Sequence, residues 1–407
     1  MGNANDDYTI DAADMEIVDG IISGDVSFTD YPLADANNDG VVDESDKVLL
    51  QDIIDRKDGI TVNVICLDRF GNNTVVPCEY PLRNVVTYAT NMQMPTLYAN
   101  GGQYIAGYFS SSYEVAEGSI NPNAMDLQGS SREISDASWT LFTQLDSSID
   151  GGVGAFLTDY SAVAQITDLR QSDLDAAGIP LANAADEITT VLTLGFLFGG
   201  DCEDLGVRYA QASWDVMNRI EAVTGDLSDE EKSTYICCTM WIYICERDST
   251  FNTTATDAGG NWYGNVNSEF GSTYQGDGST SMSSVEALSN YTGIDAVINN
   301  RSMDWGLDQS EMESTVLNCW ENERNGHPVY EYFRGLEDNM VFVNNLLPGA
   351  VKLAYMAHAL YGDDFSMEWA DGVLQEFIDL GTEPLNGQTM DTIPAYIDYA
   401  DYQAVKG

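Results

Sequence analysis

Near its centre the chain reads Cys202-Glu-Asp-Leu-Gly-Val-Arg-Tyr-Ala-Gln-Ala-Ser-Trp-Asp-Val-Met-Asn-Arg-Ile-Glu-Ala-Val223. Apolar residues recur in this stretch at spacings of three and four, which places them along one face of an α-helix. They are Leu205, Tyr209, Ala212, Val216, Ile220 and Val223. Roughly 22 helical residues span about 33 Å. The stretch therefore predicts one helix long enough to pass from one domain to another.

Short apolar runs alternate with helical stretches on both sides of this helix. Before it, we expect strands at residues 84–88, 103–109, 155–157 and 189–194. After it, we expect strands at residues 233–245, 295–298 and 339–343, and helices at 350–360 and 366–380. This alternation is typical of βαβ units around a parallel sheet.

A hairpin is expected ahead of the first block of alternating strands and helices. Residues 61–68 and 74–78 are β-type runs around Phe70-Gly-Asn72-Asn73. If the turn centres on Asn72, Cys66 and Cys78 lie opposite each other and are close enough for a disulfide. Two buried thiols are the alternative.

The charge balance limits the classes of partner. The chain has 407 residues, with 16 Lys and Arg against 66 Asp and Glu, and its net charge is −50. Phosphate contacts need clustered basic residues, so binding to nucleic acid is excluded, and docking on an anionic bilayer is disfavoured. No apolar run is long enough for a transmembrane helix, and the first residues do not resemble a signal peptide.

An acidic loop near the N-terminus has the spacing of a calcium site. It reads Asp35-Ala-Asn-Asn-Asp-Gly40-Val-Val-Asp-Glu-Ser-Asp46. Oxygen-bearing side chains stand at positions 1, 3, 5, 9 and 12, with Gly at 6 and a backbone carbonyl at 7. Position 12 is Asp where an EF-hand has Glu. The predicted Ca²⁺ ligands are Asp35, Asn37, Asp39, Val41, Asp43 and Asp46.

The same pattern begins 32 positions earlier. This copy is weaker, because Asn3 replaces the first Asp and Tyr8 replaces the Gly. A second Ca²⁺ is predicted on Asn3, Asn5, Asp7, Thr9, Asp11 and Asp14. Two loop–helix copies within residues 1–58 resemble a dockerin module, which implies either a cohesin-like partner or a cap on the next domain. Acidic turns without metal are the alternative.

The order of elements resembles the class III substrate-binding proteins of ABC importers, the iron-siderophore, haem and cobalamin group. The stretches that carry the resemblance are residues 73–87, 251–261, 284–298 and 339–357, with Phe365 and Trp369 beyond them. The resemblance implies an α/β fold of two Rossmann-like lobes joined by one long helix, here preceded by a small all-α dockerin-like module. This fusion is similar to archaeal methanogen proteins. The expected domains are residues 1–58, 59–200, 201–226 (the linker helix) and 227–407.

In such a fold the ligand is expected in a cleft formed by the loops that follow the strands of each lobe. Aromatic residues recur in these loops, although each could simply pack its lobe. The predicted cleft residues are Tyr88, Asn91, Met92, Ser110, Tyr113, Trp139, Trp241, Tyr243, Asn252, Trp262, Arg301 and Trp305. Basic residues are scarce there, which favours a corrinoid, a haem-like ligand or a neutral siderophore over an anionic one.

Enzyme motifs are largely missing from the sequence. Only His327 and His358 could act as histidine bases, and no nucleophile elbow, P-loop or zinc-protease motif occurs. We therefore predict an extracytoplasmic solute-binding protein, not an enzyme, that carries a metal chelate to an ABC permease and is membrane-anchored in its full precursor. A dockerin-bearing glycoside hydrolase or an adhesive surface module is the alternative.

Overall fold

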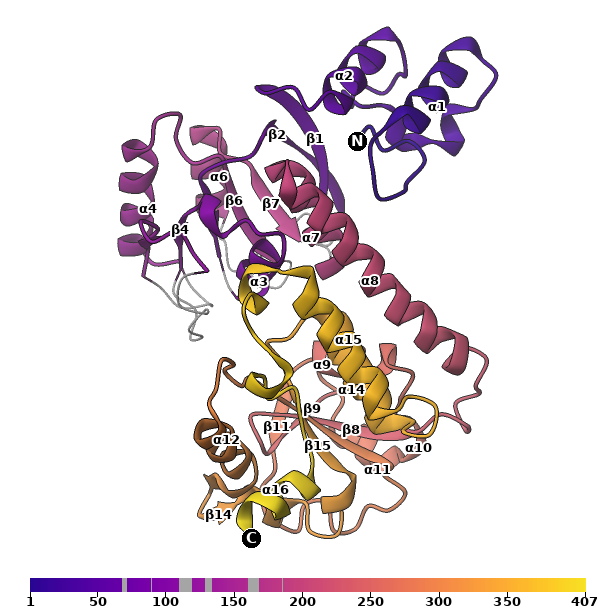
Figure 1. Ribbon diagram of the computed structural model, residues 1–407, viewed down its shortest axis with the longest axis vertical. Coiled ribbons are helices and arrows are strands. Elements are labelled where there is room, and N and C mark those ends of the chain that lie inside the picture. The colour runs from indigo at the N-terminus through magenta and orange to yellow at the C-terminus, as the bar shows by residue number, and fades with distance from the viewer. Residues whose placement is uncertain (68–71, 89, 110–118, 129–133, 160–167, 185) are drawn as a thin grey trace. The chain divides into compact units, whose positions relative to one another are not determined.

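The computed structural model describes residues 1–67, 72–88, 90–109, 119–128, 134–159, 168–184 and 186–407 (Figure 1). Contacts divide the chain into two compact units. Unit 1 comprises Met1–Ala210 and Thr382–Pro384, and unit 2 comprises Gln211–Gly381 and Leu385–Gly407. The chain passes from one unit to the other within helix α8 (Asp201–Thr224), so one unbroken helix belongs to both.

Helix α8 confirms the prediction for the central stretch. Every residue of the predicted apolar face is buried except Val223, which is 37% exposed in the last turn. Helix α7 (Glu187–Phe198) lies close against its first turns. A Cβ on Gly195 would stand 2.6 Å from the carbonyl oxygen of Cys202 and 3.2 Å from the Cα of Gly206. Two glycines therefore allow the backbones of α7 and α8 to approach closely.

The first part of unit 1 is a helical pair followed by a hairpin. Helices α1 (Ala12–Ser23) and α2 (Glu44–Ile54) pack together around Val18 and Leu50, and α2 contacts strand β1 (Ile60–Leu67), as Figure 1 shows. Strand β1 pairs antiparallel with β2 (Asn73–Tyr80). The short 3₁₀ turns Phe28–Asp30 and Pro32–Ala34 connect the two helices.

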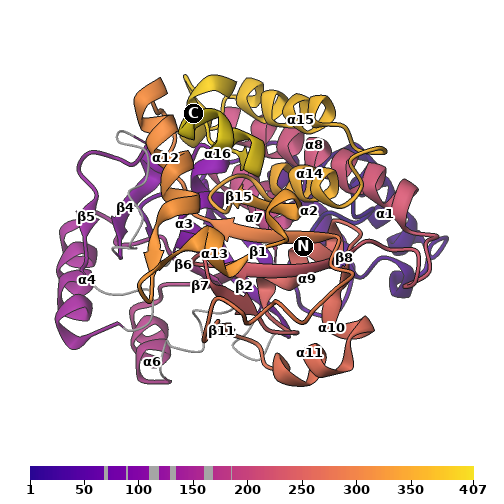
Figure 2. The same cartoon turned by 90° about the horizontal axis from the view of Figure 1, so that it is seen from below.

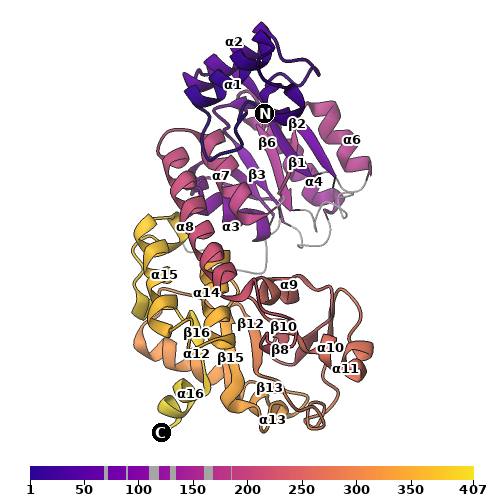
Figure 3. The ribbon, with the colours of Figure 1, turned by 90° about the vertical axis from the view of Figure 1, so that its right-hand side faces the viewer.

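The rest of unit 1 is built on a parallel sheet in the order β5-β4-β3-β6-β7. Its strands are β3 (Val85–Thr87), β4 (Ile105–Tyr108), β5 (Met125–Asp126), β6 (Ala155–Asp159) and β7 (Leu181–Ala184). Its helices are α3 (Thr90–Tyr98), α4 (Asp136–Ser148), α6 (Asp168–Ala177) and α7. Helices α3 and α7 cover one face and α4 and α6 the other (Figure 3). The parallel sheet with crossover helices confirms the α/β class for this half.

The strand expected at residues 189–194 is wrong, because these residues form the middle of helix α7. The segment is rich in Thr, Val and Leu, which favour a strand. However, Asp186 caps a helix here, and its Oδ1 accepts a hydrogen bond of 2.8 Å from the backbone N–H of Thr189. The cap and the buried apolar face of α7 outweigh the local strand preference.

Unit 2 has a mixed sheet in the order β11-β9-β8-β12-β15-β16, with β10 beside β8. Strands β8 (Thr234–Thr239), β12 (Ala296–Arg301) and β15 (Met340–Asn344) are parallel, and all their residues are buried except Thr234, Thr239 and Arg301. The other strands are β9 (Tyr243–Cys245), β10 (Asn261–Trp262), β11 (Ser279–Ser281) and β16 (Tyr396–Ile397). A separate small hairpin joins β13 (Glu323–Arg324) to β14 (His327–Pro328).

Helices α12 (Gln309–Glu321), α14 (Gly349–Leu360) and α15 (Met367–Leu380) lie on one side of this sheet, and α10 (Tyr263–Val266) and α11 (Ser268–Thr273) lie on the other (Figures 2 and 3). Helix α16 (Tyr399–Lys406) packs beside α12, and the remaining helices are α9 (Thr250–Asp257) and α13 (Val329–Tyr332). The helices expected at 350–360 and 366–380 are confirmed. Within the described residues, none of the helices combines the length and the apolar character needed to cross a bilayer.

The single strand expected at residues 233–245 is wrong, because the run folds back on itself. Strands β8 and β9 are antiparallel neighbours joined by a turn at Met240 and Trp241. Both turn residues have positive φ, 44° and 70°. Neither is Gly or Asn, so the turn carries no residue that usually marks a hairpin.

Candidate functional site

The two acidic loops of unit 1 share one hydrogen-bond frame. In the first, the backbone N–H groups of Asn5 and Asp11 donate to Oδ1 and Oδ2 of Asp14, at 3.1 and 2.8 Å. In the second, those of Asn37 and Asp43 donate to the two oxygens of Asp46, at 3.0 and 2.9 Å. The N–H groups at positions 5 and 7 follow the same correspondence. The 32-residue repeat in the sequence is therefore also a repeat of structure.

Each loop runs directly into a helix through a capping box. Asp11 caps α1 and Asp43 caps α2, with Asp14 and Asp46 at the third helical position. Asp14 and Asp46 are fully buried, and burial raises the pKa of the Asp14 carboxyl despite the backbone hydrogen bonds that lower it. Across the described residues, no three His, Cys, Asp or Glu side chains converge as metal ligands do. The Ca²⁺ ligand sets therefore stay predictions.

The helical pair is joined to the rest of unit 1 by polar contacts. The guanidinium of Arg56, just beyond α2, pairs with the Glu203 carboxylate in α8 and lies 5.3 Å from the centre of the Phe196 ring in α7. Asn63 on β1 donates from Nδ2 to the carbonyl of Ala36 at 2.9 Å. These contacts hold the acidic loops against the α/β part of the same unit.

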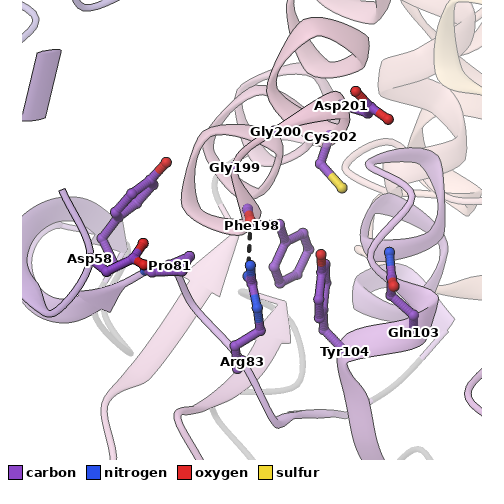
Figure 4. A pocket seen from close by; sticks show the side chains of 11 residues that line it. Asp58, Pro81, Arg83, Gln103, Tyr104, Phe198, Gly199, Gly200, Asp201 and Cys202 are labelled. Carbon is purple, nitrogen blue, oxygen red and sulfur yellow. Dashed lines mark hydrogen bonds between the residues drawn. The ribbon is translucent and has the colours of Figure 1, made fainter. Parts of the chain in front are cut away.

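A cavity of about 300 Å³ opens in unit 1, between the end of β2 and the start of α8. It is lined by Asp58, Tyr80, Pro81, Arg83, Gln103, Tyr104, Phe198, Gly199, Gly200, Asp201 and Cys202 (Figure 4). Arg83 donates to the carbonyl of Phe198 at 2.8 Å, and its guanidinium lies 4.1 Å from the centre of the Tyr104 ring. The Arg83 guanidinium is thus already engaged by other residues of the cavity wall. None of the predicted cleft residues lines this cavity.

The strongest site geometry lies in unit 2, at the carboxyl ends of the parallel strands. Arg301 ends β12, and its guanidinium carbon is 3.6 Å from the centre of the Trp241 ring, in the turn after β8. The guanidinium carbon of Arg324, from the β13–β14 hairpin, is 3.7 Å from the same centre. Two cations therefore stack on one indole. Ligands of open α/β sheets bind at this edge.

Buried amides hold this edge in place. Asn299 donates from Nδ2 to the carbonyl of Trp241 at 2.8 Å. Asn344, the last residue of β15, donates to the carbonyl of Met303 at 2.8 Å and accepts from its N–H at 3.2 Å. Within the described residues, neither Nε1 of Trp241 nor Oδ1 of Asn299 has a hydrogen-bond partner, although both atoms are buried. Unpaired buried polar atoms are costly to leave in a folded protein.

The structure separates the predicted cleft residues of unit 1. Tyr88 is fully buried and packs on Phe109 and Phe156, with ring centres 5.2 and 6.2 Å away. It belongs to the core, so its assignment to the cleft is wrong. Trp139 is half-buried in α4 and stacks on Phe142. Ser110, Tyr113 and the side chains of Asn91 and Met92 lie outside the described residues.

In unit 2, Asn252 and Trp262 are also buried. Asn252 donates from Nδ2 to the carbonyls of Cys245 and Glu246, so it fixes a turn. Trp262 packs on Phe270 and lies under the Arg247 guanidinium. These two are packing residues and not cleft residues. Tyr243 and Trp305 are half-buried. Among the predicted cleft residues that the structure describes, Trp241 and Arg301 lie together in one cluster.

Sequence reasoning missed Arg324. It lies on a hairpin whose turn is Asn325-Gly326, with φ of 52° and 81°. Asn-Gly is the strongest short signal for a two-residue hairpin. That signal could have revealed the hairpin, but not its position over Trp241.

The predicted Cys66–Cys78 disulfide is wrong. The register of β1 and β2 pairs Cys66 with Thr74, and Cys78 with Val62. The partner of Cys66 therefore lies four residues before the predicted one. Cys78 is a buried thiol.

Comparisons with known proteins bear on the fold. No family model matches the chain, and no curated protein sequence matches it. The chain is similar in structure to the TroA-like periplasmic binding protein FepB of Veillonella parvula, with a TM-score of 0.59 and 13% identity over 82% of this chain and 99% of that one.

Two further structures agree. One is the molybdate periplasmic binding protein MolA of Haemophilus influenzae, with a TM-score of 0.53 and 11% identity over 80% of this chain and 99% of that one. The other is an ABC transporter solute-binding protein of Sulfurospirillum deleyianum, with a TM-score of 0.52 and 11% identity over 78% and 94%. The chain therefore has the fold of the TroA-like periplasmic binding proteins.

Proposed function

We propose that this protein is the solute-binding component of an ABC importer, works outside the cytoplasm and captures a metal chelate with anionic groups. The proposal is supported by the likeness to binding proteins along nearly their whole length. The observation that carries the choice of ligand is the placement of Arg301 and Arg324 on Trp241 at the carboxyl edge of the unit 2 sheet.

Guanidinium groups pair with carboxylates through two parallel hydrogen bonds. Stacking on an indole orients the guanidinium plane while leaving its N–H groups at the rim. In a chain with 16 basic residues against 66 acidic ones, two arginines on one ring are an exceptional concentration of positive charge. They favour a chelate that carries carboxylates or other anionic groups, such as haem or an anionic ferric siderophore, over the corrinoid or neutral ligand that the sequence favoured.

The experiment is a titration of the full chain with haemin, a ferric carboxylate siderophore and cyanocobalamin, followed by tryptophan fluorescence and native mass spectrometry. We expect saturable micromolar or tighter binding of an anionic chelate and none of cyanocobalamin. Preferential binding of cyanocobalamin would contradict the ligand class. If all three chelates fail to bind, the importer function itself loses its support.

We also propose that each acidic loop holds one Ca²⁺. The donors are carboxylate, amide and backbone oxygens only, which suits a hard cation. Asp14 and Asp46 are fully buried carboxylates, and the charge of a cation would offset the cost of burying them. The contacts of Arg56 with Glu203 favour a role within unit 1 over capture of a cohesin-like partner.

A further inference from the structure

The hairpin of β8 and β9 brings two cysteines together. Its register pairs Cys238 with Ile244 and Thr239 with Tyr243. One step further from the turn, Cys237 stands opposite Cys245. Directly opposed residues of an antiparallel pair have Cα atoms about 4.5–5.5 Å apart, and disulfides span about 4.4–6.8 Å between Cα atoms. The backbone of this hairpin is therefore already at bridging distance.

The two side chains share one buried face of the sheet. Both residues have no exposed surface, and both are thiols in the structure. Burial raises the pKa of Cys237, and a hydrogen bond with the Cys245 thiol raises it further. The pKa of Cys237 thus responds to the Cys245 thiol, as expected for side chains at directly opposed positions on one face of the sheet. Cys238 is the next residue along β8, so its side chain points to the opposite face.

We propose that Cys237 and Cys245 form a cross-strand disulfide when the chain folds in an oxidising compartment. A small disulfide of the glutathione type serves as the oxidant. One cysteine thiolate attacks it and releases one small thiol, and the second cysteine thiolate then displaces the other. The two cysteines lose two protons and two electrons, and the small disulfide is reduced to two thiols.

Closure belongs to folding and not to the finished protein. In the folded state the Cys237 sulfur accepts a hydrogen bond from Asn300 Nδ2 at 3.0 Å and lies 3.6 Å from the Phe251 carbonyl oxygen. Burial raises the pKa of Cys237 and of Cys238, so neither of these two thiols is poised as a thiolate once packed. The bridge must therefore close while the hairpin is still open to solvent.

The bridge would close a short loop that contains the Met240–Trp241 turn. Both turn residues have positive φ, which is unfavourable for side chains of their size. A cross-link at the base of the hairpin limits the alternatives open to this turn in the unfolded chain. The indole that carries Arg301 and Arg324 is thus presented by a covalently closed loop.

The test uses the full chain refolded with a mixture of reduced and oxidised glutathione. The protein is then denatured in an alkylating reagent without reductant, digested with trypsin and analysed by mass spectrometry. Lys232 and Arg247 flank one tryptic peptide, Ser233–Arg247, which contains Cys237, Cys238 and Cys245. We expect this peptide to carry one alkyl group and to lack two hydrogens. After reduction it should carry three alkyl groups.

Variants assign the bridge within the peptide. The cross-link should persist in Cys238→Ala and disappear in Cys245→Ala, with Cys319→Ala as a matched buried-cysteine control that keeps it. Three alkyl groups on the unreduced wild-type peptide would overturn the proposal, and so would a cross-link that persists in Cys237→Ala. If a variant fails to fold, the wild-type peptide can be reduced and labelled with a second alkylating reagent of different mass: the first label should then lie on Cys238, and a first label on Cys237 or Cys245 would overturn the proposal. Ligand binding plays no part in this measurement.

Discussion

The guanidinium of Arg301 stacks on the indole of Trp241, with 3.6 Å between the guanidinium carbon and the ring centre. Arg301 ends strand β12 and Trp241 lies in the turn after β8, and the two meet at the carboxyl edge of the parallel strands of unit 2. Arg324 adds a second guanidinium at 3.7 Å. This cluster places positive charge at the sheet edge where open α/β folds bind ligands, and it can be tested one residue at a time.

Arg324→Gln should weaken binding of an anionic chelate by about tenfold or more, because a hydrogen bond to a charged group contributes about 1.5–3 kcal/mol. The stability of the protein should change little, since Arg324 is partly exposed. Fluorescence titration gives the dissociation constant. Arg247→Gln, which removes a guanidinium 5.2 Å from the centre of the Trp262 ring, is the matched control and should leave affinity unchanged. Equal losses in both variants would remove Arg324 from the site.

Arg56→Ala should lower the free energy of unfolding by about 2 kcal/mol, because it leaves the half-buried Glu203 carboxylate without its ion-pair partner and removes a cation from the Phe196 ring. Urea unfolding measures the change. Lys57→Ala breaks the neighbouring but exposed pair with Asp52 and should cost no more than about 0.5 kcal/mol. Two similar losses would mean that the Arg56 contact is not what joins the helical pair to unit 1.

Calcium should raise the melting temperature of the wild-type protein, and a chelator should reverse the effect. Isothermal titration should give two sites. Asp39→Ala should remove one of them, because Asp39 is exposed and accepts only the N–H of Val41, so its loss spares the rest of the loop. Asp30→Ala, an exposed aspartate outside both loops, should keep two sites. If the wild-type protein gives no heat of binding at millimolar calcium, both proposed Ca²⁺ sites are refuted.

The Glu383 carboxyl should make unit 1 sensitive to pH. Burial raises its pKa from 4.5 to about 7, although the N–H of Gly102 donates to it at 2.8 Å and lowers the pKa in part. Between these two values the folded chain keeps a proton that the unfolded chain has lost. Stability contributed by this group is therefore fully present below about 4.5 and is lost as the pH rises through about 7.

Glu383→Gln should flatten that part of the pH dependence of the melting temperature, because an amide cannot ionise but still accepts the hydrogen bond from Gly102. Glu376→Gln, on the surface of α15, is a suitable control and should keep the wild-type slope. An unchanged slope in Glu383→Gln would assign the pH dependence to other groups.

The sequence predicted those features that depend on long periodic patterns. The stripe from Leu205 to Ile220 spans several turns of α8, and most of the loop pattern at Asp35 recurs 32 positions earlier, so chance alternatives are few. Short apolar runs were less informative. The continuous apolar run at 233–245 predicts one strand, whereas in the structure it folds back at Met240 and Trp241, which carry no local turn signal.

The site was predictable only in part, for a geometric reason. Trp241 follows the parallel strand β8 and Arg301 ends the parallel strand β12, so the fold rule alone places them at one edge. Tyr88 follows a strand as well, but the core around Phe109 and Phe156 encloses it. Whether a side chain after a strand points into the core depends on packing against elements that are distant in the sequence. The local spacing of residues therefore does not predict it.

One carboxylate in each acidic loop serves two elements at once. Asp14 and Asp46 close their loops and also complete the capping boxes of α1 and α2. Loop closure and helix initiation are therefore a single folding event in each repeat. A chain that loses this carboxylate would lose the first turn of its helix together with the loop, and a protease would meet a frayed helix rather than an isolated surface loop.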